Sequence, residues 1–147
     1  MASFNFTNLA KHLAKADTDF DTATFKVLLV TSIPTTTDTT GNQDAWEFRA
    51  AITNEVASGS GYTTGGIAQA FTLNAITLVG GKQTITWTNI TNGWTTSTFS
   101  AVGAIIYQNT GNSATDILLH FVDFGGTVSC TAGNFSITYS TTFDITA

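Results

Sequence analysis

Hydrophobic and hydroxyl-bearing side chains alternate with a period of two from Phe135 to Ile145. Apolar residues take the odd positions, interrupted only by Thr141, and Ser, Thr or Asp take the even positions. Successive side chains of a strand point to opposite faces, so this period predicts a strand with one buried and one hydrated face. Most of the chain repeats the pattern in shorter form, which predicts antiparallel strands with a Thr-rich exterior.

About seven or eight strands are expected, separated by short turns. The turn signals are Gly80-Gly81, Asn92-Gly93, 109–113 and Gly125-Gly126. The segments that predict strands are Phe25–Thr31, Phe71–Leu78 with a change of phase at Ile76, 84–88, Phe99–Tyr107, Ile117–Phe124, Val128–Thr131 and Phe135–Ile145. Many short strands with frequent turns indicate a mainly β fold, either an antiparallel β-sandwich or a jelly-roll-like barrel.

One or two short helices are expected in the N-terminal third. The first begins at Thr7 or Asn8 and runs to Ala16, with Leu9 and Leu13 on one side at helical spacing. The second candidate spans Asn42–Val56, where Asn42 is a suitable N-cap.

The 147 residues are expected to form a single domain, 1–147. Charged residues make up only 10% of the chain, against about 25% in typical domains, and Thr takes their place at about one residue in five. A Thr hydroxyl hydrates a surface while the branched Cβ favours extended backbone. Such a surface carries little charge to keep copies apart, which favours a protein that works in an assembly.

The net charge of −5 excludes some classes of partner. The five basic residues form no dense patch, so we expect no nucleic-acid binding, which requires several adjacent cations. The longest apolar runs, Phe25–Val30 and Val102–Tyr107, are far shorter than the ~20 residues of a membrane span. Cys130 is the only cysteine, so an intrachain disulfide is excluded.

Two motifs resemble ligand loops but lack required parts. Asp17-x-Asp19-x-Asp21 begins like a calcium loop, yet Thr22 and Leu28 stand where Gly and an acidic ligand are needed. We therefore interpret it as a polar turn. The glycine-rich run 59–66 follows a candidate helix and precedes a strand, the reverse of a phosphate-binding loop, so it is interpreted as a connector.

No set of residues predicts catalysis. His120 and Cys130 lie in strand-like segments without an evident third group, and Asp116, Asp123 and Asp144 are a carboxylate set that only the fold could bring together. We expect no enzyme activity, no catalytic residue, no cofactor, no metal and no small-molecule substrate.

Aromatic residues supply the candidate protein-interface residues Phe4, Phe6 and Trp94. Residues 1–6 are interpreted as an extended arm in which Phe4 and Phe6 could dock on a neighbour. Trp87 alternates into the expected core and Trp46 falls in the second candidate helix, which leaves Trp94 as the tryptophan expected at the surface. An exposed Trp is more often an interface anchor than a sugar-binding platform.

The order of several short segments resembles small structural proteins of tailed bacteriophages, in particular capsid cement or decoration proteins. The similarity covers nearly the whole chain, and it rests on Leu9–Lys15, Asp17-x-Asp19, Lys26–Val30, Glu47-Phe48, Ser60–Gly66, Thr86–Asn89, Ala104–Tyr107 with Thr110-Gly111, Val122–Gly126 and Thr131–Ile137.

The resemblance implies a jelly-roll-like fold and a non-enzymatic virion protein, made in the host cytoplasm, that binds the outer capsid surface and stabilises the head. The implied partners are the major capsid protein and copies of the chain itself, as a dimer or trimer, with no nucleic acid and no membrane. One alternative is a head-fibre or tail-associated virion protein that binds a host receptor or glycan. A second alternative is an unrelated enzyme or binding module, which would require a deep pocket with convergent polar groups.

Overall fold

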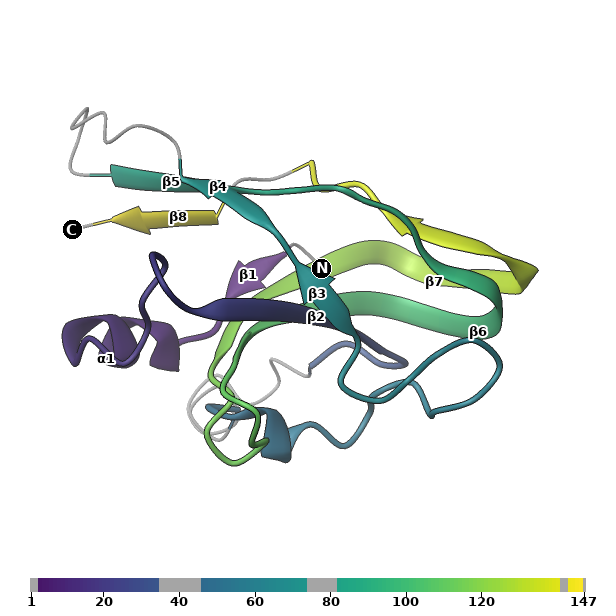
Figure 1. Cartoon of the computed structure of the whole chain (residues 1–147), viewed down its shortest axis with the longest axis horizontal. Coiled ribbons are helices and arrows are strands. Elements are labelled where there is room, and N and C mark those ends of the chain that lie inside the picture. Colours follow the sequence, from purple (N-terminus) through teal and green to yellow (C-terminus); the bar gives the residue numbers. More distant parts are fainter. Residues whose placement is uncertain (1–2, 35–45, 74–81, 141–142, 147) are drawn as a thin grey trace.

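The computed structural model describes residues 3–34, 46–73, 82–140 and 143–146, and these residues form a mainly β structure (Figure 1). The elements in chain order are β1 (Phe4–Asn5), α1 (Asn8–Ala14), β2 (Thr24–Val30), the 3-10 helix η1 (Arg49–Ala51), β3 (Ile67–Gln69), β4 (Phe71–Leu73), β5 (Lys82–Trp87), β6 (Ile90–Asn109), β7 (Leu118–Ile137) and β8 (Phe143–Thr146).

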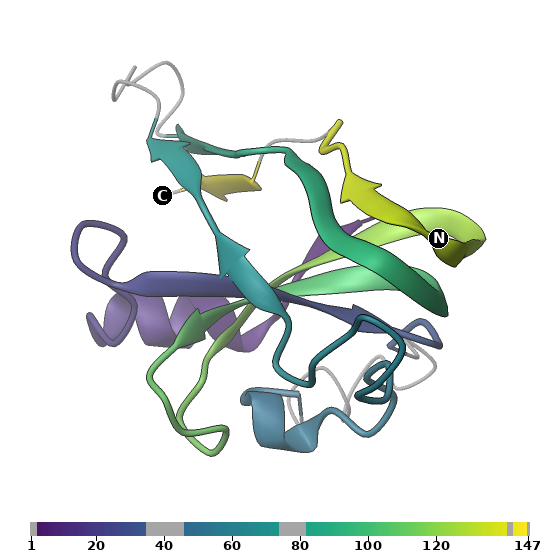
Figure 2. The same ribbon diagram turned by 45° about the vertical axis from the view of Figure 1, so that its right-hand side comes forward.

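Two antiparallel sheets are stacked. The larger sheet has the strand order β1-β7-β6-β2-β3, and the smaller has the order β4-β5-β8. β3 and β4 follow one another across Ala70 and carry the chain from one layer to the other (Figure 2). The prediction of a mainly β antiparallel fold is confirmed, in its sandwich-like form.

β6 and β7 dominate the larger sheet and are strongly bent. Each spans 20 residues, and their pairing shifts register several times along the ribbon. Ala101 pairs with Val128 whereas Gly103 pairs with Asp123, so four residues of β7 (124–127) face one residue of β6. Bulges bend the strand that carries the extra residues. Both strands therefore curve from the lower layer of Figure 1 to the upper one.

Two expected turns are bulges within these strands. Asn92 lies inside β6 with φ 53°, and Gly125 lies inside β7 with φ 76°. The left-handed backbone that Asn and Gly tolerate serves a bulge as well as a hairpin turn. The predictions of turns at Asn92-Gly93 and Gly125-Gly126 were therefore wrong, while the Gly80-Gly81 turn and the phase change at Ile76 lie outside the described residues.

The first predicted helix is confirmed and the second is wrong. α1 spans Asn8–Ala14, close to the expected range. Within 46–56 only Arg49–Ala51 is helical, as one 3-10 turn, and Asn42 lies outside the described residues. The N–H of Arg49 donates to the carbonyl of Asp116 and that of Ala50 to Ser113, so bonds to a distant loop replace the i→i−4 bonds of a helix.

The larger sheet is buried on both faces at β2, where Val27–Val30 is an unbroken apolar run. Phe25, Val27 and Leu29 face the core between the sheets, and Leu28 and Val30 face a second apolar cluster on the opposite side. Residues 46–52 pack against that second cluster through Trp46 and Ile52, which are half-buried.

The alternating burial predicted from Phe135 onward is confirmed, but the prediction that Phe135–Ile145 forms one strand is wrong. Phe135 and Ile137 are buried while Ser136 and Thr138 are exposed, as a period of two requires. However, β7 ends at Ile137, and Phe143–Thr146 forms β8, which pairs with β5 in the other sheet. The alternating segment therefore passes from one sheet to the other.

Candidate functional site

The β6–β7 ribbon has one end without charge. We call residues 90–101 of β6 and 128–137 of β7 the distal half, and Gly103–Asn109 with Leu118–Asp123 the proximal half. The distal half contains no Asp, Glu, Lys or Arg. Its exposed side chains include the hydroxyl residues Thr91, Thr95, Thr96, Thr98, Ser100, Ser129, Thr131 and Ser136.

Some of these hydroxyls form hydrogen bonds at the bulges of the two strands. The hydroxyls of Ser100 and Ser129 lie 2.7 Å apart across the two strands. Thr98 Oγ1 accepts the N–H of Ala132 at 2.9 Å, and Ser136 Oγ accepts that of Asn92 at 2.8 Å. The bulges leave these N–H groups outside the regular ladder, and the hydroxyls satisfy them.

Aromatic rings fill the interior of the distal half. Trp94 packs on Tyr62 with ring centroids 6.1 Å apart, and Phe99 lies 5.1 Å from Phe135. Trp94 is only 3% exposed, so the prediction that it lies at the surface was wrong. A turn at Asn92-Gly93 was expected to leave Trp94 at the surface. The chain instead forms a bulge there, which turns the Trp94 side chain to the buried face.

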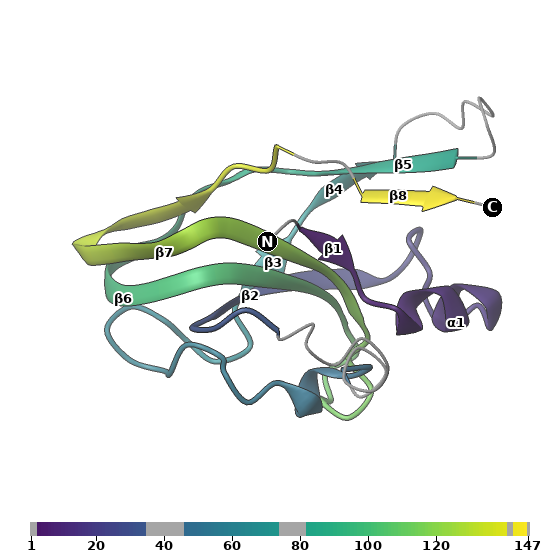
Figure 3. The same ribbon diagram turned by 180° about the vertical axis from the view of Figure 1, so that it is seen from behind.

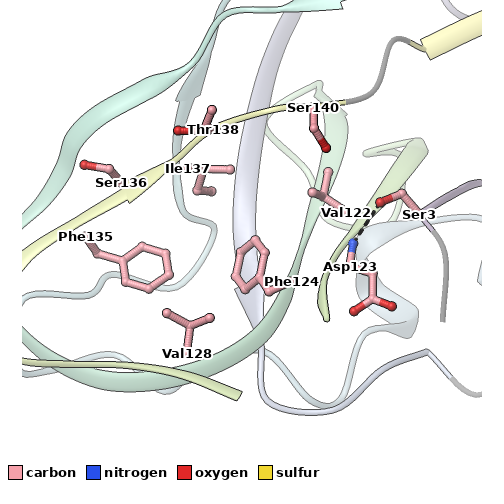
Figure 4. Close-up of a pocket in the computed structure, with 10 residues that line it drawn as sticks. All are labelled: Ser3, Val122, Asp123, Phe124, Val128, Phe135, Ser136, Ile137, Thr138 and Ser140. Atoms are coloured by element: carbon pink, nitrogen blue, oxygen red, sulfur yellow. Dashed lines mark hydrogen bonds between the residues drawn. The ribbon is translucent and has the colours of Figure 1, made fainter. Parts of the chain in front are cut away.

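A cavity of about 340 Å³ opens where β7 bends back over itself (Figure 4). The rings of Phe124 and Phe135 point into it, together with the side chain of Val128. Ser3 and Asp123 lie at one rim, where Ser3 Oγ accepts the N–H of Asp123 at 3.0 Å. The lining therefore mixes apolar side chains with the polar side chains of Ser3, Asp123, Ser136, Thr138 and Ser140.

The described N-terminal residues lie against the sheet. Phe4 pairs with Phe121 and Asn5 with His120, which makes β1 an edge strand on β7. Phe6 is 2% exposed and β1 is paired within the chain, so Phe6 of the expected extended arm 1–6 is not exposed for docking on a neighbour. Phe4 is half-buried, with its ring 5.2 Å from that of Phe121. An interface role for Phe4 stays a prediction.

The proximal half is held by a buried ion pair. Asp116 is completely buried, and its Oδ2 accepts a 2.7 Å hydrogen bond from Nε of Arg49. Its Oδ1 accepts the backbone N–H and the hydroxyl of Thr110. The guanidinium of Arg49 also lies 5.4 Å from the ring centre of Tyr107. Burial raises the pKa of Tyr107 to about 12, so its hydroxyl stays protonated and donates to the carbonyl of Gly65.

A second network fixes the glycine-rich connector. Tyr62 donates to Oε1 of Glu55 at 2.9 Å and accepts the N–H of Leu29 at 3.0 Å. Burial raises the pKa of the Tyr62 hydroxyl, which keeps it neutral. A Cβ on Gly66 would lie 1.8 Å from the carbonyl oxygen of Val27, so only Gly allows this approach. The interpretation of 59–66 as a tightly turned connector is consistent with these contacts.

Charged side chains of the N-terminal third gather beside α1. Nζ of Lys11 donates to Oε1 of Glu47 at 2.6 Å, and this bond lowers the pKa of Glu47. The ring of His12 is buried, with Nδ1 3.1 Å from Asp17 and Nε2 2.9 Å from Glu47. A second cavity of about 300 Å³ lies beside His12 and Asp17 and is also lined by Phe48.

The polar turn after α1 forms as predicted. Asp19 Oδ1 accepts the N–H of Asp21, and Oδ2 accepts the hydroxyl of Thr22 at 2.6 Å, which is the main reason that the pKa of Asp19 is lowered. In the described part of the chain, no group of three or more His, Cys, Asp and Glu residues is placed to hold a metal ion.

The candidate catalytic pair does not meet. His120 pairs with Ile106 and Cys130 with Phe99, so seven residues of β6, or about 23 Å of strand, separate the two. Nδ1 of His120 instead lies 2.7 Å from Oδ1 of Asn5, and Cys130 accepts a hydrogen bond from Ser97. Burial lowers the pKa of His120 to about 4, so the ring is neutral at pH 7.

The three candidate carboxylates have separate surroundings. Asp116 is engaged by Arg49, and Oδ1 of Asp123 accepts the N–H of Gly125. Asp144 lies on β8 in the smaller sheet. Within the described ranges, no helix has the length and hydropathy that crossing a membrane requires.

Comparison with known proteins does not assign this chain to a family. No protein-family model, no curated protein and no solved structure matches it. Functional inference therefore depends on the chemistry of the distal half and on the cavity beside it.

Proposed function

We propose that the chain is a non-enzymatic virion structural protein that binds the outer surface of a capsid and stabilises the head. The observation that carries this proposal is the exposed, hydroxyl-rich and charge-free surface of the distal half. The resemblance to capsid cement and decoration proteins supports it. The partners are then the major capsid protein and further copies of the chain.

An uncharged hydroxyl surface is suited to being covered by a partner. Removing a charged group from water is costly unless it is paired, and the buried centres of protein interfaces are depleted in charged residues. A Thr or Ser hydroxyl can both donate and accept, so it can replace its bonds to water by bonds to a partner. Many such copies on a shell gain avidity from modest individual contacts.

The decisive experiment compares two exposed threonines on purified capsids. Thr95 lies in the distal half, and Thr53 lies in the loop after η1. Thr95→Lys places a charge in the proposed contact and should weaken capsid binding at least about tenfold, or 1.4 kcal/mol. Thr53→Lys should leave binding unchanged.

Binding is measured by co-sedimentation with capsids, and electron microscopy of decorated particles locates the protein. A wild-type chain that does not bind capsids would refute the proposal. Equal binding by wild type and Thr95→Lys would show that the distal half is not the contact.

A second candidate function is binding of a host glycan by a head-fibre or tail-associated protein. The cavity of about 340 Å³ favours it, because Phe124 and Phe135 offer an aromatic floor and Asp123 a hydrogen-bond acceptor at the rim. A glycan array with the wild type and with Phe124→Ala tests this candidate. Signals lost in the variant support it, and an array without signals excludes it.

A further inference from the structure

In the part of the chain that the structure describes, one long strand edge of the larger sheet has no partner strand. The edge strands β1, β3, β4 and β8 are two to four residues long. β7 differs, because β1 pairs with it only at Phe121 and His120. Among the described strands, Val128–Ile137 is therefore paired with β6 on one side and with nothing on the other. In Figure 3, β7 runs above β6, and β1 lies toward the right-hand end of β7.

The opposite edge of the same ribbon is covered. The N–H of Thr98 on β6 donates to the carbonyl of Ser60 at 2.8 Å, so the glycine-rich connector lies along β6. Gly93 of β6 also lies against Ile67, since a Cβ there would be 2.6 Å from the Ile67 side chain. The two strands of the distal half thus differ: the chain protects β6 and leaves β7 open.

The open edge lacks some of the features that prevent strand pairing. Exposed edges are usually short, covered, bulged, or interrupted by Lys or Pro. Residues 128–137 contain neither Lys nor Pro. Register shifts interrupt them between Ile137 and Phe135 and on both sides of Gly133. Val128–Cys130 keeps regular pairing with Phe99–Ala101, so its outward N–H and C=O groups form a short regular template.

We propose that the free edge of β7, Val128–Ile137, pairs antiparallel with the same edge of a second copy of the chain, about a two-fold axis perpendicular to the sheet. Antiparallel pairing of one strand with its own copy is self-complementary, as a two-fold interface requires. A two-fold axis perpendicular to the sheet makes both copies bend toward the same side. The curvature of β7 is therefore compatible with this pairing.

Charge and exposed apolar area identify a second copy as the partner. Two chains of net charge −5 repel each other, yet this edge brings no charged side chain of one copy against the other. Val128 is 41% exposed, one of the two large apolar side chains so exposed in the described part of the chain, and it lies at the start of the edge that pairing would cover.

Two serines give a matched pair of variants. Ser129 on β7 and Ser100 on β6 are both exposed, lie opposite one another and share one hydrogen bond. Ser129→Lys and Ser100→Lys therefore lose the same contact and add the same charge. Only Ser129 lies on the free edge, where the new charge would face its copy across the two-fold axis.

The test measures the mass of the full chain in solution, without capsid, by analytical ultracentrifugation over a range of concentrations. We expect a wild-type dimer, a dimer dissociation constant raised at least about tenfold in Ser129→Lys, and a change of less than about threefold in Ser100→Lys. Amide hydrogen exchange should show protection of residues 128–137 that increases with protein concentration.

Three outcomes would overturn the inference: a wild type that stays monomeric at about 1 mM, equal weakening by both lysines, or concentration-dependent protection that lies elsewhere. The pairing is measured without capsid, so its failure leaves the proposed capsid contact standing. Failure of capsid binding likewise leaves the dimer standing.

Discussion

The two halves of the β6–β7 ribbon use polar groups in opposite ways. At the proximal half, Tyr107 of β6 and the adjacent Asp116 and Arg49 are buried or partly buried, and each has a specific protein partner. In the distal half, polarity comes from neutral hydroxyls that face water. Enclosed polar groups stabilise one arrangement, because an unpaired one is costly. The distal half uses hydroxyls such as those of Thr98 and Ser136 to hold its bulged backbone and presents others, such as that of Thr95, to water.

This difference separates the residues that maintain the structure from those available for contact. The buried network joins β6 to 46–66 and 110–116, segments that cover the proximal half. The distal half is stabilised from inside by aromatic packing, so its outer face is free to serve another purpose. Breaking each half in turn tests this division.

The largest expected effect is in the proximal half. Asp116→Ala leaves the partly buried guanidinium of Arg49 without its carboxylate and should lower the free energy of unfolding by about 3–5 kcal/mol. Urea unfolding followed by Trp fluorescence measures the change. Asp21→Ala removes an exposed carboxylate and should change stability by less than about 0.5 kcal/mol. Equal effects would show that the buried pair contributes no more than a surface charge.

Acid should destabilise the proximal half through His120. Burial lowers the pKa of His120 to about 4 in the folded chain, from about 6.5 in the unfolded chain. Between these two values the unfolded chain binds more protons, so the free energy of unfolding decreases as the pH is lowered. The loss between pH 7 and pH 5 should be about 2 kcal/mol. Thermal unfolding at several pH values measures it, and His120→Gln should flatten the dependence. An equally steep dependence in that variant would rule out His120 as its source.

The sequence predicts the strands well because their signal is local. The apolar run Val27–Val30 of β2 and the alternation over Phe135–Thr138 report burial directly, and both are confirmed. The second helix fails because the N–H groups of Arg49 and Ala50 bond to a loop more than 60 residues away, and a local pattern contains no information about that loop. Asn92 and Gly125 are correctly predicted to permit unusual backbone, but the same residues suit a turn and a bulge.

The candidate site was only partly predictable. Low charge and abundant Thr are visible in the composition, and they indicated a surface suited to assembly. That two uncharged segments with exposed hydroxyls lie side by side follows from the register of β6 against β7, which the sequence does not reveal. The misplacement of Trp94 has the same origin, because a bulge reverses the face to which later residues point.

Tyr62 connects the two halves, and its hydroxyl should have an intermediate effect. Tyr62→Phe keeps the stacking on Trp94 but leaves Glu55 and the N–H of Leu29 without this partner. We expect stability to fall by about 1–2 kcal/mol, measured by urea unfolding. Tyr62→Leu, which also removes the ring, should be more destabilising. If both variants lose the same amount, the ring adds nothing to the distal half.

The smallest expected effect concerns the distal surface. Thr95→Lys, the variant expected to lose capsid binding, should change the free energy of unfolding by less than about 0.5 kcal/mol, because Thr95 is exposed. Urea unfolding measures this change beside the capsid assay. A stable variant that no longer binds would mean that the absence of charge serves contact and not folding. A destabilised variant would assign these hydroxyls to the fold, and the division between the two halves would no longer hold.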